Sequence, residues 1–544
     1  MKRHGGRILT DQLEAEGIER VFSVPGESFL AVLDGLHDSG ILNVVCRHEG
    51  GAAMMAEATA KLTGRPGVAF VTRGPGAANA SAGVHVAQQD STPMVLFIGQ
   101  IARGHRDRDV FQEVDYRQFF GGMAKWVAEV DDTARLPEYV ARAFHVARTG
   151  RPGPVVVALP EDVLSDIAEV PLRPPSVLPE PVVSEAQLSA ILSALGRAQR
   201  PLVIAGGSGW SAAAAADLQA FAEAAGLPVA VSFRRQDYMD NRSPAYAGDL
   251  GVGANPALMR RLAEADCLLV LGARLTDIAT GGFTAMDPAG HGKTILHVHP
   301  DAATIGSVYR VDLAVAAPAP AVVARLAAAN MPAAPAGLAS QARAAYEAWQ
   351  SPRETPGAVK MEEVVRWLSD TLPEDAILTN GAGNYAAWLH RYFRFKRFGT
   401  QVAPTSGSMG YGFPAAIAAS LAHPGRGVVC LAGDGCFQMT LNEMSTAVQH
   451  GATPIVIVAN NGRYGTIRMH QEKHYPGRVS GTELANPDYA ALAQAYGGHG
   501  ETVEDGAEFP AAFARAEASG RLAVIELRLD PRALSTGADL PGGG

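Results

Sequence analysis

The chain has 544 residues, more than the roughly 250–300 that a single hydrophobic core rarely exceeds, so we expect several domains. Hydrophobic residues make up 47% and charged residues 19%, which excludes an intrinsically disordered protein. The formal net charge of −9, from 46 basic and 55 acidic side chains, argues against nucleic acid or an anionic membrane as a partner.

The N-terminus and the cysteines narrow the class further. The segment MKRHGGRILTDQLEAEG lacks the apolar core of a signal peptide, and apolar runs such as PIVIVA are strand-sized rather than membrane-spanning. Neither CxxC pairs nor zinc-site spacing is found among the cysteines, which are Cys46, Cys267, Cys430 and Cys436. We therefore expect a reduced, cytoplasmic protein with no membrane partner. An enzyme is the default interpretation, and an intracellular scaffold is the alternative.

Strand-like and helix-like segments alternate almost throughout, which is typical of α/β domains with parallel sheets. In the first unit the predicted helix covers about 50–62 and is closed by Gly64, and the predicted strands cover 41–46, 67–72, 94–100 and 153–160. The proline-rich stretch 171–183 lacks periodicity, so we predict an interdomain linker there.

Two further units follow this linker. The predicted strands of the second unit cover 201–210, 267–275 and 294–300, and those of the third cover 376–384, 427–435 and 454–461. Between these units, an Ala/Pro-rich stretch from about 318 to 335 predicts a second linker. We therefore predict three consecutive α/β domains with parallel sheets, the first and third alike in architecture, at 1–170, 185–335 and 355–544.

The third unit contains the strongest functional signal. One predicted strand ends in the GDG of 433–435, and the next runs into the NN of 460–461. In a βαβ unit both strands are parallel, so Asp434 and Asn461 are expected at the same sheet edge, where α/β sheets bind ligands. Their oxygens suit Mg²⁺, and small glycines let a diphosphate approach backbone N–H groups. The spacing predicts an Mg²⁺–diphosphate site, whereas GDG or NN alone is equally consistent with a turn or a loop.

A helix is predicted between these two strands. Thr440 and Glu443 form a candidate capping box, and Gly451 is a candidate C-cap. An apolar stripe is provided by Leu441, Met444 and Val448. These positions predict an amphipathic helix.

The GDG–NN pair, with 24 residues (436–459) between its parts, resembles the signature of the thiamine diphosphate (ThDP) enzyme superfamily. The resemblance implies thiamine diphosphate and Mg²⁺ as cofactors. It implies metal ligation by Asp434, by the Asn461 side chain and by the Arg463 carbonyl. It also implies a pyrimidine-binding first domain, a central Rossmann-like domain and a diphosphate-binding third domain.

The resemblance also implies an activating carboxylate in the first unit, where Glu49 follows a predicted strand. In the superfamily this Glu hydrogen-bonds N1′ of the aminopyrimidine and favours the imino tautomer, whose 4′-nitrogen takes the C2 proton. Such chemistry requires a carboxylate in a dry site. The alternative is an acid that interacts with a helix dipole. Glu57 lies in the interior of the predicted helix, and we do not expect it to be the activating carboxylate.

Further cofactor contacts are implied by SGSMGYGFPAA (406–416) and by GAGNYAAW (381–388). Met409 stands where the superfamily has a bulky apolar residue that wedges the cofactor into a V shape, although Met is more often simple core filling. The Gly407 carbonyl then accepts a hydrogen bond from the 4′-amino group. The implied cofactor-binding residues are Glu49, Pro25, Gly26, Asn79, Gly383, Asn384, Tyr385, Gly407, Met409, Gly433, Asp434, Gly435, Cys436, Asn461, Arg463, Tyr464 and Gly465.

Resemblance to the acetohydroxyacid (acetolactate) synthase branch covers nearly the whole chain. It includes RHEGGAAMMAEATAKLTGRPG, VFQEVD, AKWV and the reaction-centre loop VPGESFLAVLDGL. The substrate-pocket residues that it implies are Glu27, Ser28, Phe111, Gln112, Lys125 and His470. A surface lysine and an ordinary polar histidine are the alternatives for the last two.

Several departures from this branch bear on cofactor and substrate. Gly50 replaces the usual Gln, and His470 aligns with the Trp that narrows the synthase pocket. DLGVGANPAL (249–258) replaces the FAD-binding GMHG element, although GAR (272–274) persists, so we expect FAD to be absent. The paired histidines of pyruvate decarboxylases are missing.

The resemblance implies decarboxylation of a 2-oxo acid, or use of another acyl donor, with carboligation of the enamine to a carbonyl acceptor. The main alternative is a ThDP-dependent lyase, either a 2-oxo acid decarboxylase or a 2-hydroxyacyl lyase. A nucleotide-binding oxidoreductase rests only on GGSGW and GAGN, which do not spell GxGxxG. A degenerate partner subunit is disfavoured by Glu49, Asp434 and Asn461 together. Because the two half-sites lie on different domains, we expect a homodimer or homotetramer.

Overall fold

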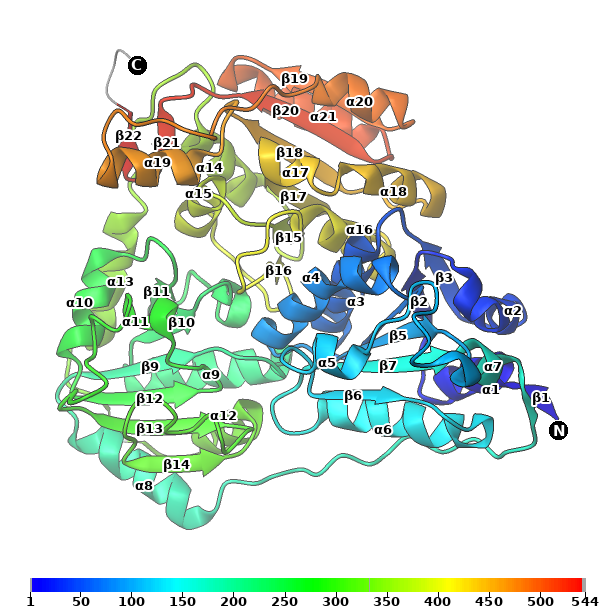
Figure 1. The fold of residues 1–544 in the computed structure, drawn as a ribbon. Helices are drawn as coiled ribbons and strands as arrows, with labels where there is room; N and C mark the ends of the chain where they lie inside the picture. Colours follow the sequence, from blue (N-terminus) through cyan, green and yellow to red (C-terminus); the bar gives the residue numbers. More distant parts are fainter. Residues whose placement is uncertain (1, 332, 541–544) are drawn as a thin grey trace.

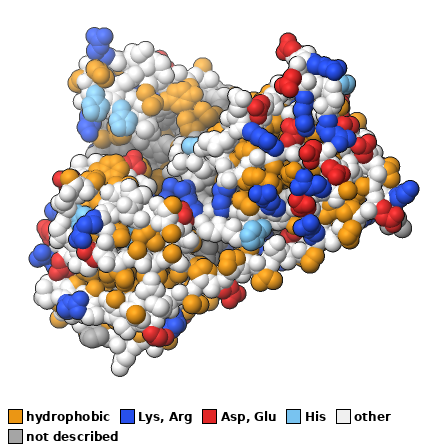
Figure 2. Space-filling view, turned by 60° about the horizontal axis from the view of Figure 1, so that its bottom comes forward, with side chains coloured by type: hydrophobic (Ala, Val, Ile, Leu, Met, Phe, Trp, Pro, Cys, Tyr) orange, Lys and Arg blue, Asp and Glu red, His pale blue; other side chains and the backbone are white. Residues whose placement is uncertain are grey.

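A computed structural model of the chain describes residues 2–331 and 333–540. It contains three six-stranded sheets whose strands are all parallel, with helices packed around each sheet in three lobes (Figure 1). This arrangement confirms the predicted α/β class. None of the helices in the described part of the chain is both long and apolar enough to span a membrane. Basic and acidic side chains are interspersed over the face in Figure 2.

The first sheet has the strand order β3-β2-β4-β5-β7-β6. Its strands are β2 (Arg20–Ser23), β3 (Leu42–Val45), β4 (Gly67–Val71), β5 (Met94–Gln100), β6 (Trp126–Glu129) and β7 (Pro154–Pro160). Its helices are α1 (Gly5–Ala15), α2 (Leu30–His37), α3 (Glu49–Thr63), α4 (Pro75–Asp90), α5 (Tyr116–Phe120), α6 (Leu136–Arg148) and α7 (Glu161–Ser165). Short strands β1 (Arg3–His4) and β8 (Ile167–Ala168) pair antiparallel beside it.

The third sheet has the order β16-β15-β17-β18-β20-β19, so strands taken in chain order are arranged as in the first sheet. Its strands are β15 (Ile377–Asn380), β16 (Gln401–Val402), β17 (Val428–Gly433), β18 (Ile455–Asn460), β19 (His499–Val503) and β20 (Ala523–Arg528). Its helices are α14 (Met361–Thr371), α15 (Tyr385–Tyr392), α16 (Gly412–Ala422), α17 (Asp434–Gln438), α18 (Met444–His450), α19 (Gly465–His474), α20 (Tyr489–Ala495) and α21 (Phe509–Ala518). Strands β21 (Ala533–Ser535) and β22 (Ala538–Asp539) form a hairpin.

The central sheet differs, with the doubly wound order β11-β10-β9-β12-β13-β14. Its strands are β9 (Pro201–Ala205), β10 (Val229–Ser232), β11 (Tyr246–Leu250), β12 (Cys267–Leu271), β13 (Thr294–His299) and β14 (Leu313–Ala316). Its helices are α8 (Glu185–Arg197), α9 (Ala212–Ala225), α10 (Pro256–Glu264), α11 (Asp277–Thr280), α12 (Ala319–Ala327) and α13 (Leu338–Trp349).

The two predicted linkers have different outcomes. Residues 171–183 contain no helix or strand and run as an extended segment between the first and central lobes (Figure 1). The stretch 318–335 is not wholly a linker, because α12 occupies its first half. This helix buries Val322, Val323 and Leu326, so apolar side chains at helical spacing outweigh the prolines that suggested a break.

The segment between the GDG and NN motifs is also more broken than predicted. A short 3-10 helix at Leu441–Glu443 precedes α18, and Gly451 ends α18 in the left-handed conformation as expected. The predicted capping box does not form. Thr440 Oγ1 donates to the Gly410 carbonyl at 2.8 Å, and the Glu443 carboxylate accepts a hydrogen bond from the first domain. The predicted apolar stripe is also incomplete, because Val448 is 43% exposed.

The first and third domains share one hydrophobic core. Helices α3 and α16 pack against each other, and the cluster around them includes Phe22 and Val44 of the first domain with Ile377 and Phe413 of the third. The charged residues at the ends of these two sheets are therefore held in a fixed relation within one chain.

Candidate functional site

A cavity of about 240 Å³ lies at the carboxyl edge of the third sheet. Every cofactor-binding residue predicted for the third domain lines it: Gly383, Asn384, Tyr385, Gly407, Met409, Gly433, Asp434, Gly435, Cys436, Asn461, Arg463, Tyr464 and Gly465. Strands β17 and β18 are parallel, with Gly433 opposite Ala459, so the residues that follow them emerge side by side. The topology thus gathers four separate sequence motifs around one space.

Glycines make room in this cavity. A Cβ atom on Gly433 would lie 2.8 Å from the Tyr385 ring, and one on Gly435 would lie 2.5 Å from the Tyr464 ring. Both distances are too short for a real side chain, so only glycine leaves the floor open. Helix α17 begins at Asp434, between these two glycines.

Asp434 is a buried carboxylate that other groups hold in place. Its Oδ1 accepts from its neighbour Gly435 N at 2.8 Å, and its Oδ2 accepts from Gly462 N at 2.9 Å. Burial raises the pKa of Asp434, partly offset by these donors. Nearby, Asn461 Oδ1 accepts from Arg463 N at 3.3 Å. A carboxylate and an amide side chain, from Asp434 and Asn461, therefore lie together on the wall of the cavity.

The oxygen atoms at this wall are suitable ligands for a hard cation. Among residues 2–331 and 333–540, no cluster of three or more His, Cys, Asp or Glu side chains forms a metal site of its own. One carboxylate with neutral oxygens is what Mg²⁺ accepts when phosphate oxygens and water complete its octahedron. The residues present therefore fit an Mg²⁺–diphosphate group better than a zinc or calcium ion.

Sequence reasoning missed three residues that support this wall. Asn486 donates from Nδ2 to Asp434 Oδ2 and to Asn460 Oδ1, each at 2.8 Å. Asn460 in turn donates to Glu526 Oε1 at 2.5 Å, and Glu526 is fully buried. Only Asn460 carried a sequence signal, as part of the NN pair. Asn486 and Glu526 lie far along the chain in segments without a motif.

The first domain carries the second group of predicted residues. Glu49 begins α3 and is 9% exposed, and its Oε2 accepts from Asn79 Nδ2 at 3.0 Å. A Cβ atom on Gly76 would lie 3.1 Å from Glu49 Oε1. The turn containing Pro25 and Gly26 packs against Thr72 at the end of β4. These predicted residues are thus grouped at the carboxyl edge of the first sheet.

Glu443 joins the two domains close to Glu49. Its fully buried carboxylate accepts from Arg47 N at 3.2 Å through both oxygens and from Thr446 Oγ1 at 2.5 Å. The segment that presents Glu49 is therefore fastened to the third domain of the same chain. The cavity itself is lined only by residues between 382 and 534 among those described, so Glu49 is not part of its wall within one chain.

Three of the six predicted substrate-pocket residues lie around the 72–76 turn. Glu27 pairs with Arg73 at 3.1 Å, and the buried Ser28 hydroxyl lies 2.9 Å from that of Thr72. Gln112 packs against Gly74, while its neighbour Phe111 is 72% exposed. Glu27, Ser28 and Gln112 therefore lie near one edge.

Lys125 and His470 do not join that group. The Lys125 ammonium donates to the Val146 and Thr149 carbonyls, both at 2.6 Å, where α6 ends. Burial lowers its pKa. Within this chain the last carbonyls of a helix therefore occupy the Lys125 charge, and its role in the substrate pocket stays a prediction. His470 is exposed on α19, its ring 6.2 Å from that of His474.

Comparisons with known proteins agree with this geometry. Family models of thiamine pyrophosphate enzymes match three segments of the chain. They are the N-terminal TPP binding domain at 3–119, the central domain at 188–326 and the C-terminal TPP binding domain at 381–527.

Similar curated proteins are acetolactate synthases. The large subunit from Parasynechococcus marenigrum is 33% identical over 519 residues, covering 92% of this chain and 83% of that protein. The isozyme 2 large subunit from Escherichia coli is 31% identical over 505 residues, covering 92% and 91%. The large subunit from Corynebacterium glutamicum is 32% identical over 517 residues, covering 91% and 81%.

Proposed function

The chain belongs to the thiamine pyrophosphate enzyme family, in its acetolactate synthase branch, and we propose that it joins a decarboxylated 2-oxo acid to a carbonyl acceptor. The observation that carries this proposal is the single cavity in which the GDG, NN, SGSMG and GAGN motifs meet. Among the described residues of the site, we find no feature that favours simple lyase chemistry instead.

Residues of the third domain are proposed to hold the cofactor. Asp434, the Asn461 amide oxygen and the Arg463 carbonyl would ligate Mg²⁺, and Gly433 and Gly435 would leave room for the diphosphate. Asn486 would keep Asp434 turned toward the metal, since it binds the same carboxylate oxygen that Gly462 N binds. Gly407 and Met409 would contact the rest of the cofactor.

When bound, thiamine diphosphate supplies a carbon nucleophile and an electron sink for the bonds that break and form. Glu49 is proposed to hold the activating proton on Oε1, which receives no hydrogen bond from the described residues, while Asn79 fixes Oε2. Low exposure keeps water from competing for that proton. Glu27, Ser28 and Gln112 are proposed to border the substrate at the same edge.

A homodimer, or a pair of dimers, is proposed as the active assembly. Its support is the separation of the half-sites, because the described walls of the cavity come from the third domain while Glu49 lies on the first. A second copy would bring its Glu49 to the cavity. An active monomer in size-exclusion chromatography would contradict this assembly.

The test uses purified protein with ThDP, Mg²⁺ and pyruvate, and it measures released CO₂ and new C–C products by mass spectrometry. We expect both, and a panel of 2-oxo acids with and without added aldehyde identifies the preferred donor and acceptor. CO₂ without any ligated product would support the lyase instead. The predicted absence of FAD is checked in the same sample, because a flavin would make the protein yellow.

A further inference from the structure

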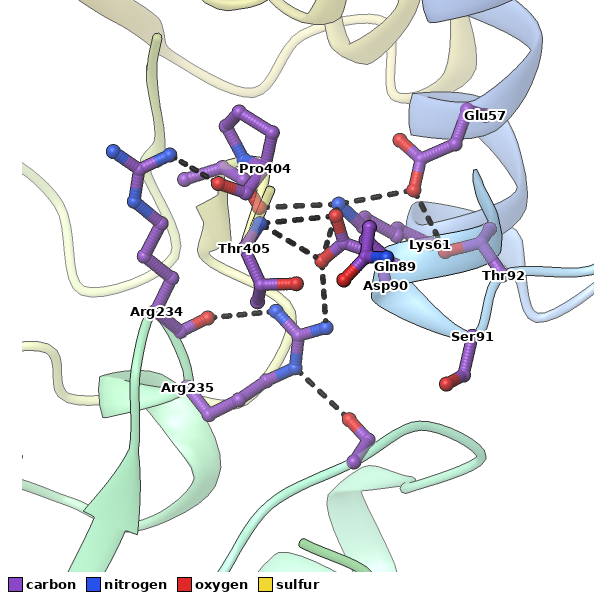
Figure 3. A network of polar contacts seen from close by, with 12 residues as sticks. Glu57, Lys61, Gln89, Asp90, Ser91, Thr92, Arg234, Arg235, Pro404 and Thr405 are labelled. Atoms are coloured by element: carbon purple, nitrogen blue, oxygen red, sulfur yellow. Dashed lines mark hydrogen bonds and ion pairs between the residues drawn. The ribbon is translucent and has the colours of Figure 1, made fainter. Parts of the chain in front are cut away.

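Three consecutive residues, 403–405, come directly before the SGSMG segment, and each is bound by a charged side chain from another domain (Figure 3). Lys61 of the first domain donates to the Ala403 carbonyl at 3.1 Å. The Arg234 guanidinium of the central domain donates to the Pro404 carbonyl. Asp90 Oδ2 of the first domain accepts from Thr405 N at 3.0 Å.

These charges are fixed by one another as well as by the backbone. Lys61 Nζ lies 3.0 Å from Glu57 Oε1 and 3.1 Å from Asp90 Oδ1, and Arg235 Nη2 reaches the same Asp90 oxygen at 3.0 Å. Burial alone would raise the pKa of Asp90, but Lys61 and Arg235 hold it below its ordinary value. The cluster is therefore a connected network of opposite charges at the junction of all three domains.

The far end of the SGSMG segment is anchored by the same network. Tyr411 OH donates to Glu57 Oε2 at 2.5 Å. The segment 406–410, which contributes Gly407 and Met409 to the cavity, therefore lies between two anchors. Both of its ends are therefore fixed by hydrogen bonds to buried charged side chains.

Arg234 connects this segment to a second wall of the cavity. Its Nη2 donates to the Gly381 carbonyl at 2.7 Å, and Gly381 directly precedes the cavity residues Ala382 and Gly383. One guanidinium thus binds both the loop between β15 and α15 and the loop between β16 and α16, and it fixes the position of one loop relative to the other. A lysine with its single ammonium lacks the planar fork for this task.

The backbone of Arg234 is strained at the residue that makes these contacts. Its φ is +59°, in the left-handed region that few residues other than glycine adopt, and its side chain is 3% exposed. Its Nε finds no partner among the described residues. Strain and buried charge persist where the surrounding structure demands one geometry, and apolar side chains would fill this junction at lower cost.

We propose that Lys61, Asp90 and Arg234 are positioning residues that form a three-point clamp on residues 403–405. The clamp sets segment 406–410 for the cofactor without touching the cofactor itself. This inference rests on the proposed cofactor site. A displacement of a binding loop by about 1 Å is enough to weaken its contacts severely.

The experiment measures hydrogen exchange of amides 406–411 in the unliganded, full-length protein, and ThDP affinity from tryptophan fluorescence with Mg²⁺ present. Arg234→Lys keeps the charge but loses the fork, and Asp90→Asn keeps the shape but loses the charge. Each variant is expected to speed exchange about tenfold and to weaken ThDP binding about tenfold, the size of one lost charge-assisted hydrogen bond.

Lys293→Met is the matched control, because Lys293 is a buried lysine that donates to the Ala263 and Ala265 carbonyls within the central domain. The Lys293→Met variant is expected to keep the wild-type exchange rates at 406–411 and the wild-type ThDP affinity, even if its melting temperature falls. Unchanged exchange at 406–411 in both Arg234→Lys and Asp90→Asn would overturn the clamp. A wild type that binds no ThDP would overturn the proposed function, and the exchange rates would still decide whether the clamp exists.

Discussion

The first and third domains have the same strand order but carry opposite chemistry at equivalent strand ends. After the third strand of each sheet, the first domain places Arg73 and the third domain places Asp434. After the second strand, the first domain presents Glu49 and the third presents the glycine-rich segment 406–410. The same strand order therefore supports two different proposed sites, one that holds a proton in the first domain and one that binds metal and diphosphate in the third. The fold provides the sheet edge, and a few residues at that edge determine its chemistry.

The difference extends to how the two edges are supported. Asp434 is oriented by neighbours within its own domain, chiefly Asn486. The segment that presents Glu49 is held from outside its domain, by Glu443. Variants that affect one edge and spare the other therefore test whether the two edges have separate tasks.

The largest effect is expected from Glu49→Gln. This change keeps the shape and the Asn79 contact but removes the group that holds a proton, so the rate of product formation should fall about 10²–10⁴-fold. Mg²⁺ binding should remain and ThDP binding should weaken little, because most of the proposed cofactor-binding residues lie in the third domain, which is unaltered. Steady-state product formation and a fluorescence titration measure the two properties. Glu19→Gln, a substitution of an exposed residue in the same domain, serves as the control. Full activity in Glu49→Gln would contradict a proton-holding role for the edge of the first sheet.

A smaller but selective effect is expected from Asn486→Ala. Asp434 loses the amide that fixes its Oδ2, so the Mg²⁺ concentration for half-maximal activity should rise about 10–100-fold. The maximal rate at saturating Mg²⁺ should change little, since Glu49 is untouched. Titration of EDTA-treated protein with Mg²⁺ measures both quantities. An unchanged Mg²⁺ requirement would show that Asn486 has no part in the metal edge.

Glu443→Gln tests the connection between the edges through its pH dependence. Burial raises the pKa of Glu443 above its ordinary value of 4.5, so the folded state favours the protonated acid. The wild type should therefore lose stability, relative to this variant, as the pH rises from 4.5 through the raised pKa. Melting temperatures of both proteins between pH 4.5 and 7.5 check this sign. A difference that does not vary with pH would contradict it.

The smallest effect is expected from Arg73→Gln, at the strand end equivalent to that of Asp434. Its partners Glu27 and Glu161 are 69% and 41% exposed, so the lost ion pairs should cost about 1 kcal/mol of unfolding free energy or less. The Mg²⁺ requirement should stay at the wild-type value. Urea unfolding and the Mg²⁺ titration measure these outcomes, and a raised Mg²⁺ requirement would mean that both edges contribute to the metal site.

Local patterns predicted much of this fold. Apolar runs located β5 at 94–100 and the cores of β17 and β18, and Gly64 and Gly451 mark helix ends because glycine accepts the left-handed conformation. The same patterns missed edge strand β16, a two-residue strand whose pairing rather than composition defines it. Proline density concealed α12, whose stability comes chiefly from packing against α9.

The sequence alone determined the family, the class of fold and the residues of the GDG–NN cavity, because those features are encoded in short segments with fixed spacing. Tertiary structure alone decided the contacts of Asn486, Glu443 and Arg234, and it placed the Lys125 ammonium against the end of α6. The physical reason is that a hydrogen bond between side chains distant in sequence depends on where the sheets place them. A buried polar group must find a partner in space, and no local pattern records which one.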